Sequence, residues 1–290
     1  MKLKNLSKLI LFISITLSVN AKAENVAMIA DIEGKGAITL ADSNEPAGIL
    51  LELASGSALS LEDDSKLTLF FFASSEEYTY EGPGEILIEQ QQPKLLSGKQ
   101  ANTRNLNMVK LAGIAAEDEG SIDLGVLKLR NFEKPKLQLI SPVNTKVLAQ
   151  QPKFSWTAVE GATTYQFILS NELGKKIVDV SVTDSSLVLP KGTKLASGTE
   201  YTWEIISQTS EQTEYRAHAY FSTAEQHVSL QVESSRPDSA ATFSEKIVYA
   251  RLLEKLGLKQ AAKTIWQELA ILKPNSEQLQ TRIGSGDSEQ

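Results

Sequence analysis

The stretch that decides the fold is SKLTLFFFASSEEYTYEGPGEILIE, residues 65–89, which places three phenylalanines side by side in an acidic chain. In a β-strand, Phe70 and Phe72 point to one face and Phe71 points to the other. Both faces are then apolar over half of the strand, which is typical of a strand that is buried on two sides or that enters a core from an edge. We expect Phe71 to be core. Phe70 and Phe72 have two interpretations, a second buried face or an exposed docking patch for a partner.

The surrounding residues predict an all-β unit. Between residues 26 and 88, apolar runs of four to eight residues alternate with turn signals such as Asp42-Ser43-Asn44 and Gly82-Pro83-Gly84. The polar stretch 89–105 is interpreted as a loop. Residues 106–132 regain apolar runs and are interpreted as closing strands of the same unit.

Four segments of this unit carry a resemblance to a known family. The succession GAITL, LLELASGSALSL, DDSKLTLFF and YEGPGEILIE resembles the ligand-side domain of the FecR family over roughly residues 26–130. That family's best-known members pass the signal of an outer-membrane receptor across the inner membrane to a sigma factor. The resemblance implies an extracytoplasmic β-domain. We do not expect the sigma-regulator role, because it requires a cytoplasmic segment and a membrane helix that this sequence lacks.

A second unit opens near Pro135 and alternates aromatic with polar residues. The pairs Phe154 with Trp156 and Tyr201 with Trp203 each lie two positions apart, so each pair shares one face of a strand. Together with SPVN at residues 141–144, this pattern resembles a bacterial fibronectin type III-like sandwich. The resemblance implies that both tryptophans lie between the sheets. The alternative is an exposed aromatic platform that stacks on sugars.

The last part of the chain has helical spacing. From Ser244 onward, apolar residues form two stripes that are broken at Gly257 and ended by Pro274, which predicts a helical hairpin. The pattern resembles a single tetratricopeptide repeat, and one such repeat cannot bury its own apolar face. The hairpin therefore packs on the sandwich, self-associates or binds a partner. The candidate partner-binding residues of the chain are Phe70, Phe72, Leu253, Leu256 and Trp266.

The first residues predict export. Residues 1–23 combine a basic start, an apolar run too short to span a bilayer and the small residues Ala21 and Ala23. Removing the four lysines of this segment leaves 25 basic and 36 acidic residues, a net charge of −11, which disfavours nucleic acid and anionic lipid. No cysteine is present, so neither disulfides nor a lipid-modified cysteine are available. We expect a periplasmic protein that does not insert into a membrane after signal removal.

The residues that carry chemistry are sparse. Only two histidines occur, His218 and His227, and neither lies in a zinc-binding spacing. His218 alternates with Tyr220, which favours a solvent-facing position on a strand. We predict no catalytic residue, no metal site and no cofactor. A carboxylate pair that converges only in the folded chain is the enzymatic alternative, and no sequence feature supports it.

The sequence thus predicts a mainly β protein: a FecR-like β-domain, an immunoglobulin-like sandwich and a short C-terminal α-hairpin. Its function is predicted to be binding, as an adaptor or accessory that holds an envelope protein such as a membrane-bound sensor. The alternative is a module that binds peptidoglycan or another polysaccharide. The predicted segments are a signal peptide at 1–23, the β-domain at 24–133, the sandwich at 134–224, a linker at 225–243, the hairpin at 244–280 and a disordered tail at 281–290.

Overall fold

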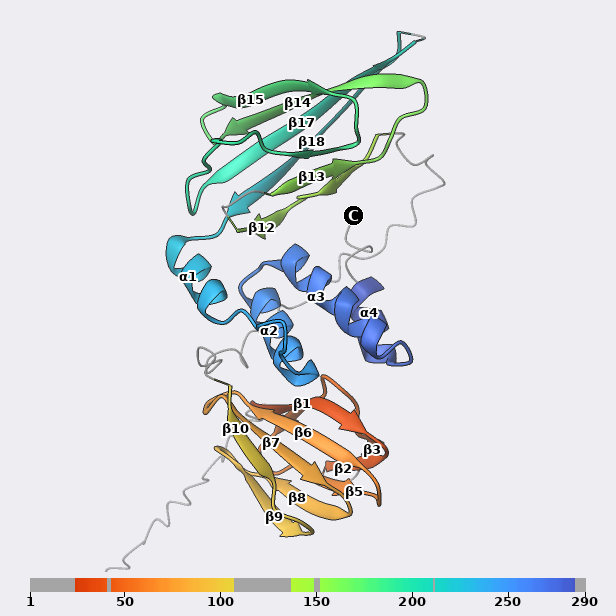
Figure 1. Cartoon of the computed structure of the whole chain (residues 1–290), viewed down its shortest axis with the longest axis vertical. Coiled ribbons are helices and arrows are strands. Elements are labelled where there is room, and N and C mark those ends of the chain that lie inside the picture. Colours follow the sequence, from red (N-terminus) through yellow and green to blue (C-terminus); the bar gives the residue numbers. More distant parts are fainter. Residues whose placement is uncertain (1–23, 41–42, 107–136, 149–151, 211, 285–290) are drawn as a thin grey trace, which may run out of the picture.

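The computed structural model describes residues 24–40, 43–106, 137–148, 152–210 and 212–284, and it arranges them in three tiers (Figure 1). A first β-module lies at one end, a second β-module lies at the other, and four helices lie between them. The protein is mainly β, as predicted, and most of its helix is C-terminal.

The first module consists of two five-stranded antiparallel sheets around one core. One sheet has the order β10-β7-β6-β1-β4 and the other has the order β3-β2-β5-β8-β9. The polar stretch predicted as a loop contains β9 and β10, which pair as edge strands through their backbones while most of their side chains face solvent. The predicted closing strands at 106–132 lie almost entirely outside the described residues. The strands are β1 (Asn25–Glu33), β2 (Gly36–Leu40), β3 (Ser43–Pro46), β4 (Glu52–Ala54), β5 (Ala58–Leu61), β6 (Lys66–Phe71), β7 (Glu76–Glu81), β8 (Gly84–Ile88), β9 (Pro93–Ser97) and β10 (Asn102–Asn105).

The phenylalanine run is explained by two separate cores on either side of one sheet. Phe71 pairs with Ala27 of β1 and lies in the core between the two sheets of the first module. Phe70, which pairs with Met28, points to the opposite face and contacts the helical tier, as does Phe72. The prediction of Phe71 as core is confirmed, and the neighbouring strand face is buried as well.

The second module is an immunoglobulin-like, fibronectin type III-like sandwich, as the sequence predicts. A three-stranded sheet of order β11-β13-β16 faces a five-stranded sheet of order β12-β18-β17-β14-β15. Trp156 and Trp203 are buried between the sheets, and the Trp203 indole Nε1–H donates to the Pro142 carbonyl oxygen at 2.7 Å. The strands are β11 (Leu139–Ser141), β12 (Thr145–Val147), β13 (Lys153–Trp156), β14 (Ala162–Asn171), β15 (Lys176–Val182), β16 (Ser186–Val188), β17 (Glu200–Thr209) and β18 (Glu214–Thr223).

The helical tier is larger than the predicted hairpin. Its helices are α1 (Gln226–Ser234), α2 (Phe243–Lys255), α3 (Lys259–Leu272) and α4 (Glu277–Gly284). The segment predicted as a linker holds α1, which buries Val228 and Val232 one turn apart. The segment predicted as a disordered tail begins within α4, whose Leu279 is buried; residues 285–290 are outside the described part.

Local sequence explains where α2 begins and ends. Thr242 caps its N-terminus in a reciprocal capping box with Glu245. At the other end, Gly257 has a φ of +74°, and the Leu258 N–H donates to the Leu253 carbonyl, so the chain leaves the helix through a left-handed residue. Within the described residues, no helix is long and apolar enough to cross a membrane.

Candidate binding groove

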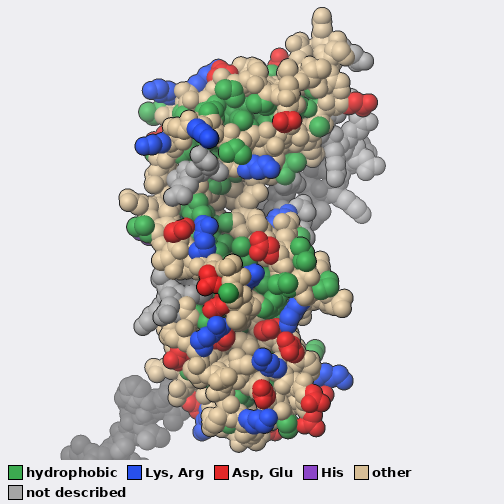
Figure 2. Space-filling model, viewed as in Figure 1, with side chains coloured by type: hydrophobic (Ala, Val, Ile, Leu, Met, Phe, Trp, Pro, Cys, Tyr) green, Lys and Arg blue, Asp and Glu red, His purple; other side chains and the backbone are tan. Residues whose placement is uncertain are grey.

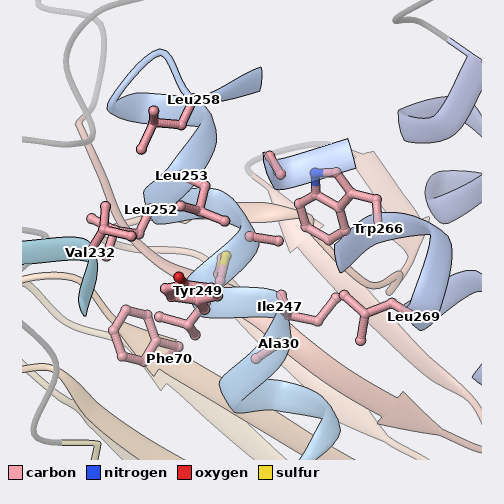
Figure 3. Packing of buried hydrophobic residues seen from close by; sticks show 14 of the residues in the cluster. Ala30, Phe70, Val232, Ile247, Tyr249, Leu252, Leu253, Leu258, Trp266 and Leu269 are labelled. Carbon is pink, nitrogen blue, oxygen red and sulfur yellow. The ribbon is translucent and has the colours of Figure 1, made fainter. Parts of the chain in front are cut away.

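The five residues predicted to bind a partner converge on one intramolecular cluster. Phe70, Phe72, Leu253 and Trp266 are buried there, and Leu256 packs against them partly exposed. Figure 3 shows Phe70 and Ala30 of the first module facing Ile247 and Tyr249 of α2. The surface formed by these candidate residues is therefore covered mostly from within the chain, by the β-sheet of the first module and by the neighbouring helices.

A buried carboxylate ties the first module to the beginning of α2. Glu77 of β7 is 6% exposed, and its Oε2 accepts a hydrogen bond of 2.6 Å from the Ser244 hydroxyl. Its Oε1 lies 3.0 Å from the Arg104 guanidinium, which also pairs with Glu245 at 3.2 Å. A charge that is buried in this way is stable only while its hydrogen bonds are made. The junction therefore favours one placement of α2 on the sheet.

A second polar network crosses the same interface further along α2. Arg251 pairs with Glu52 of β4 at 2.5 Å and with Glu254 at 2.8 Å. Glu254 in turn accepts 2.8 Å and 3.3 Å contacts from the Trp266 indole and from Arg282 of α4. One carboxylate thus links α2, α3 and α4, and the network holds the tier together as it docks on β4.

One face of the helical tier carries an open groove of about 460 Å³. Its floor comes from α2 and α3, its side from the α1–α2 loop and its end from Leu148 at the edge of the sandwich. The apolar lining is Leu148, Tyr249, Leu253, Ala261 and Ile265, and the polar lining is Arg236, Asp238, Ser239, Lys246, Thr264 and Glu268, with Pro237 in the loop. A volume of this size lies within the range of ligand-binding clefts in proteins.

The groove is built from three pairs of residues at equal distance from the turn at Gly257. Leu253 and Ala261 lie four residues before and after it, Tyr249 and Ile265 lie eight, and Lys246 and Glu268 lie eleven. Residues at equal distance from the turn of a helical hairpin lie at similar height on the two helices. The groove is consequently apolar near the turn and charged toward its open end.

The charged residues of the groove differ in whether they already have partners within the chain. Arg236 pairs with Glu233 at 3.2 Å, and the Asp238 carboxylate accepts the Ala240 N–H at 2.8 Å. Lys246, on the α2 wall, has no acidic partner within 4.0 Å among the described residues. Burial raises the pKa of Tyr249 above its ordinary value, so its hydroxyl is neutral and can hydrogen-bond at physiological pH.

The apolar surface continues past the groove along α3. Ile271 and Leu272 lie three and four residues beyond Glu268, on the continuation of the groove face, and are 79% and 59% exposed. Figure 2 shows hydrophobic side chains gathered on the helical tier among acidic and basic ones. Leu272 belongs to an apolar stripe in the sequence, and its exposure shows that this stripe is only partly covered.

A second, smaller hollow of about 270 Å³ lies where the sandwich meets the α2–α3 turn. Tyr220 of β18 lines it and is 56% exposed, with its ring 5.9 Å from that of His218. His218 is exposed on the strand, as predicted. The tryptophans of the alternative sugar-stacking platform are both buried, so Tyr220 is the aromatic side chain that the described part of the sandwich exposes most.

The described residues contain no cluster of three histidine, aspartate or glutamate side chains able to hold a metal ion. Sequence reasoning missed Lys246, Tyr249 and Glu268 as groove residues. The signal that could have indicated the α3 side of the groove is a second apolar stripe, because Ala261, Ile265 and Leu272 do not share the face of Trp266 and Leu269 that packs on α2.

No protein-family model matches the chain, and no curated protein matches it. Solved structures similar to it include CopC from Methylosinus trichosporium OB3b, at 16% identity over 31% of this chain and 95% of that one, with a TM-score of 0.26. A Fn3-like protein from Clostridium thermocellum matches at 18% identity over 30% and 94% of the chains, with a TM-score of 0.23. A two-domain fibronectin type-III segment of chicken tenascin matches at 11% over 68% and 94%, with a TM-score of 0.21. These likenesses carry no argument about function.

Proposed function

We propose that this chain is a non-enzymatic binding protein of the bacterial cell envelope, an adaptor that holds a partner protein in the groove of its helical tier. The two β-modules act as the scaffold that presents the groove. The partner is an envelope protein such as a membrane-bound sensor, and the adaptor acts in the periplasm after export.

Sequence features support the location and the class of this proposal. The export-type start at residues 1–23 and the absence of cysteine fit a periplasmic protein. The FecR-like rhythm of the first module points to extracytoplasmic signalling systems. The tetratricopeptide-like spacing of α2 and α3 points to protein–protein contacts, which such hairpins make through uncovered helix faces.

The observation that carries the proposal is the uncovered groove itself. Helix α2 packs on the first module and on α3, whereas Ile265 is partly exposed in the groove and Ile271 and Leu272 are largely exposed beyond it. A contiguous apolar surface with a polar rim is characteristic of an interaction site.

A crosslinking experiment tests the adaptor role. A photo-crosslinking amino acid replaces Thr264, which lines the groove, or Gln267, which is exposed on α3 but does not line it. In cells that express the chain at its natural level, we expect a discrete protein adduct at Thr264 and none at Gln267. Equal adducts at both positions, or none at either, would contradict the proposal.

The polysaccharide alternative is favoured by one observation, the exposed Tyr220 ring beside His218. Aromatic rings that keep their faces open are common contacts for sugars. Co-sedimentation of residues 24–290 with isolated peptidoglycan sacculi tests it, with Tyr220→Ala as the matched variant. Saturable pelleting that the substitution abolishes would make wall binding the leading function.

A further inference from the structure

We propose that the groove accepts an amphipathic helix whose apolar stripe is flanked by acidic residues on one side and by basic residues on the other. This inference rests on the proposed function, because it names the chemistry of the partner that the adaptor would hold. It follows from the order of the charges on the two walls of the groove.

The apolar part of the groove sets the shape of the occupant. Leu253 and Tyr249 lie nearly buried at the bottom of a trough between two antiparallel helices, Ala261 and Ile265 are partly exposed on its α3 side, and Ile271 and Leu272 extend the apolar surface along α3. A trough between two helices accommodates the ridge of a third helix, with side chains spaced three and four residues apart entering it. The exposed end of α3 lengthens the contact to about three helical turns, because each turn rises about 5.4 Å.

The charged pair sets the flanks of the occupant. Lys246 and Glu268 stand at the same height on opposite walls, and no ion pair joins them within 4.0 Å. The other two charged groups of the lining, Arg236 and Asp238, already have partners within the chain. A helix between the walls therefore meets a cation on one side and a carboxylate on the other, and neither group has an ion-pair partner among the described residues.

This order of charges disfavours other classes of occupant. A polyanion such as nucleic acid or an anionic lipid surface would meet Glu268 as well as Lys246, and the chain as a whole is acidic. A helix with mixed flanks pairs with both walls at once, as residues beside the apolar seam of a coiled coil do.

Three synthetic helical peptides test the inference against the full chain. All carry the same leucine stripe, and their flanks are glutamate with lysine, glutamate on both sides, or lysine on both sides. If a peptide binds in the reverse direction, each of its flanks faces the opposite wall of the groove. The mixed peptide can therefore pair with both walls in one of the two directions. We expect the mixed peptide to bind roughly fivefold more tightly than the other two, as measured by fluorescence anisotropy.

Charge reversal in the protein provides the matched controls. Lys246→Glu should shift the preference to the all-lysine peptide, and Glu268→Lys should shift it to the all-glutamate peptide. The double variant should restore the preference for mixed flanks. Both side chains reach solvent, and an acidic residue in the first turn of α2 suits the helix dipole, so the variants should fold.

The outcomes separate this inference from the adaptor role. Equal binding of the three peptides, or preferences that the substitutions leave unchanged, would overturn the inference. If no peptide binds while Thr264 crosslinks a protein in cells, the inference fails and the adaptor role stands. If the charge preferences appear but no adduct forms in cells, the chemistry of the groove is supported and the proposed function fails.

Discussion

At the scale of single residues, Gly82 is the described glycine of the first module with the least room for a side chain. A β-carbon there would lie 2.0 Å from the Glu62 carbonyl oxygen and 2.5 Å from the Ser65 hydroxyl. The Gly82 N–H also donates to the Ser65 carbonyl at 2.8 Å, so the segment cannot move away without losing that bond. We expect Gly82→Ala to lower the free energy of unfolding by about 3 kcal/mol or more, from the clash and the lost hydrogen bond.

The control for this substitution is Gly174→Ala. Gly174 has a φ of +73° but no atom within 4 Å of the added carbon, so it reports backbone strain alone, about 1 kcal/mol. Urea denaturation of both variants provides the measurement. A loss at Gly82 no larger than that at Gly174 would show that the corner relaxes.

The burial of Tyr80 should make the stability of the first module depend on pH in the alkaline range. Burial raises the pKa of Tyr80 to about 12, whereas the unfolded chain ionises near its usual value of about 10. Below pH 10 the hydroxyl is neutral in both states and its contribution is fully present. Between pH 10 and 12 only the unfolded state loses the proton, so stability falls by roughly 1.4 kcal/mol per pH unit from this residue.

The variant that checks this is Tyr80→Phe, compared with the unchanged chain by urea denaturation between pH 8 and 11. Above pH 10 the stability of the variant should fall less steeply with pH, by the slope that corresponds to the release of about one proton on unfolding. Burial also raises the pKa of Tyr78, so the stability of the variant should still fall as the pH rises above 10. Identical slopes in the two proteins would mean that Tyr80 ionises as freely in the folded chain as in the unfolded one.

The phenylalanine run shows what alternation alone can predict. Burial of Phe71 follows from the strand period, because one face of β6 is apolar along its whole length. The surroundings of Phe70 and Phe72 do not follow, because their cover is a helix that begins at Phe243. A strand pattern indicates that a face must be covered and does not indicate by what.

At the scale of elements, the docking of α2 on β7 depends on the pair Glu77 and Ser244, whose side chains are both buried. Removing the hydroxyl by Ser244→Ala leaves the carboxylate short of one hydrogen bond, which should cost about 2 kcal/mol. The double-mutant cycle with Glu77→Gln should show a coupling energy above about 1 kcal/mol.

A matched pair on the molecular surface separates this coupling from general charge effects. Glu204 and Arg216 pair at 3.1 Å on the exposed face of the sandwich, and the same cycle there should give less than about 1 kcal/mol. Urea denaturation measures both cycles. Similar coupling energies at the two sites would show that burial adds nothing at Glu77.

The elements that sequence reasoning missed share a physical cause. Helix α1 presents only Val228 and Val232 to the interior, which is too little periodicity to distinguish from a polar linker. The strands β9 and β10 are held by backbone pairing at sheet edges and carry few buried side chains. The groove could not be predicted from the sequence either, because amphipathic spacing does not indicate which part of an apolar face stays uncovered.

At the scale of the whole molecule, the helical tier shares one hydrophobic core with the first module, although its helices are C-terminal in the sequence. Residues from β1, β6, α1, α2, α3 and α4 form one continuous apolar cluster, whereas the core of the sandwich shares none of its buried residues. The sequence predicts the hairpin as a segment separate from both β-modules. The structure instead predicts that loss of the helices affects the two β-modules unequally.

A chain that ends at Ala224 tests this difference. Truncation exposes Met28, Ala30, Phe70 and Phe72 on the face of β1 and β6, so the first module should lose stability and self-associate. The sandwich should keep its thermal transition, because its aromatic core is intact. Light scattering and calorimetry of the shortened chain measure the two effects separately.

The double substitution Phe70→Ser with Phe72→Ser makes this prediction sharper, because its effect should change sign between the two chains. In the full chain it removes two rings from the interface with α2 and should destabilise the first module by about 3 kcal/mol or more. In the chain that ends at Ala224 the same rings face water, so serine should reduce self-association. If serine harms both chains alike, the two rings support the β-module itself; opposite effects mean that their role is to receive the helical tier.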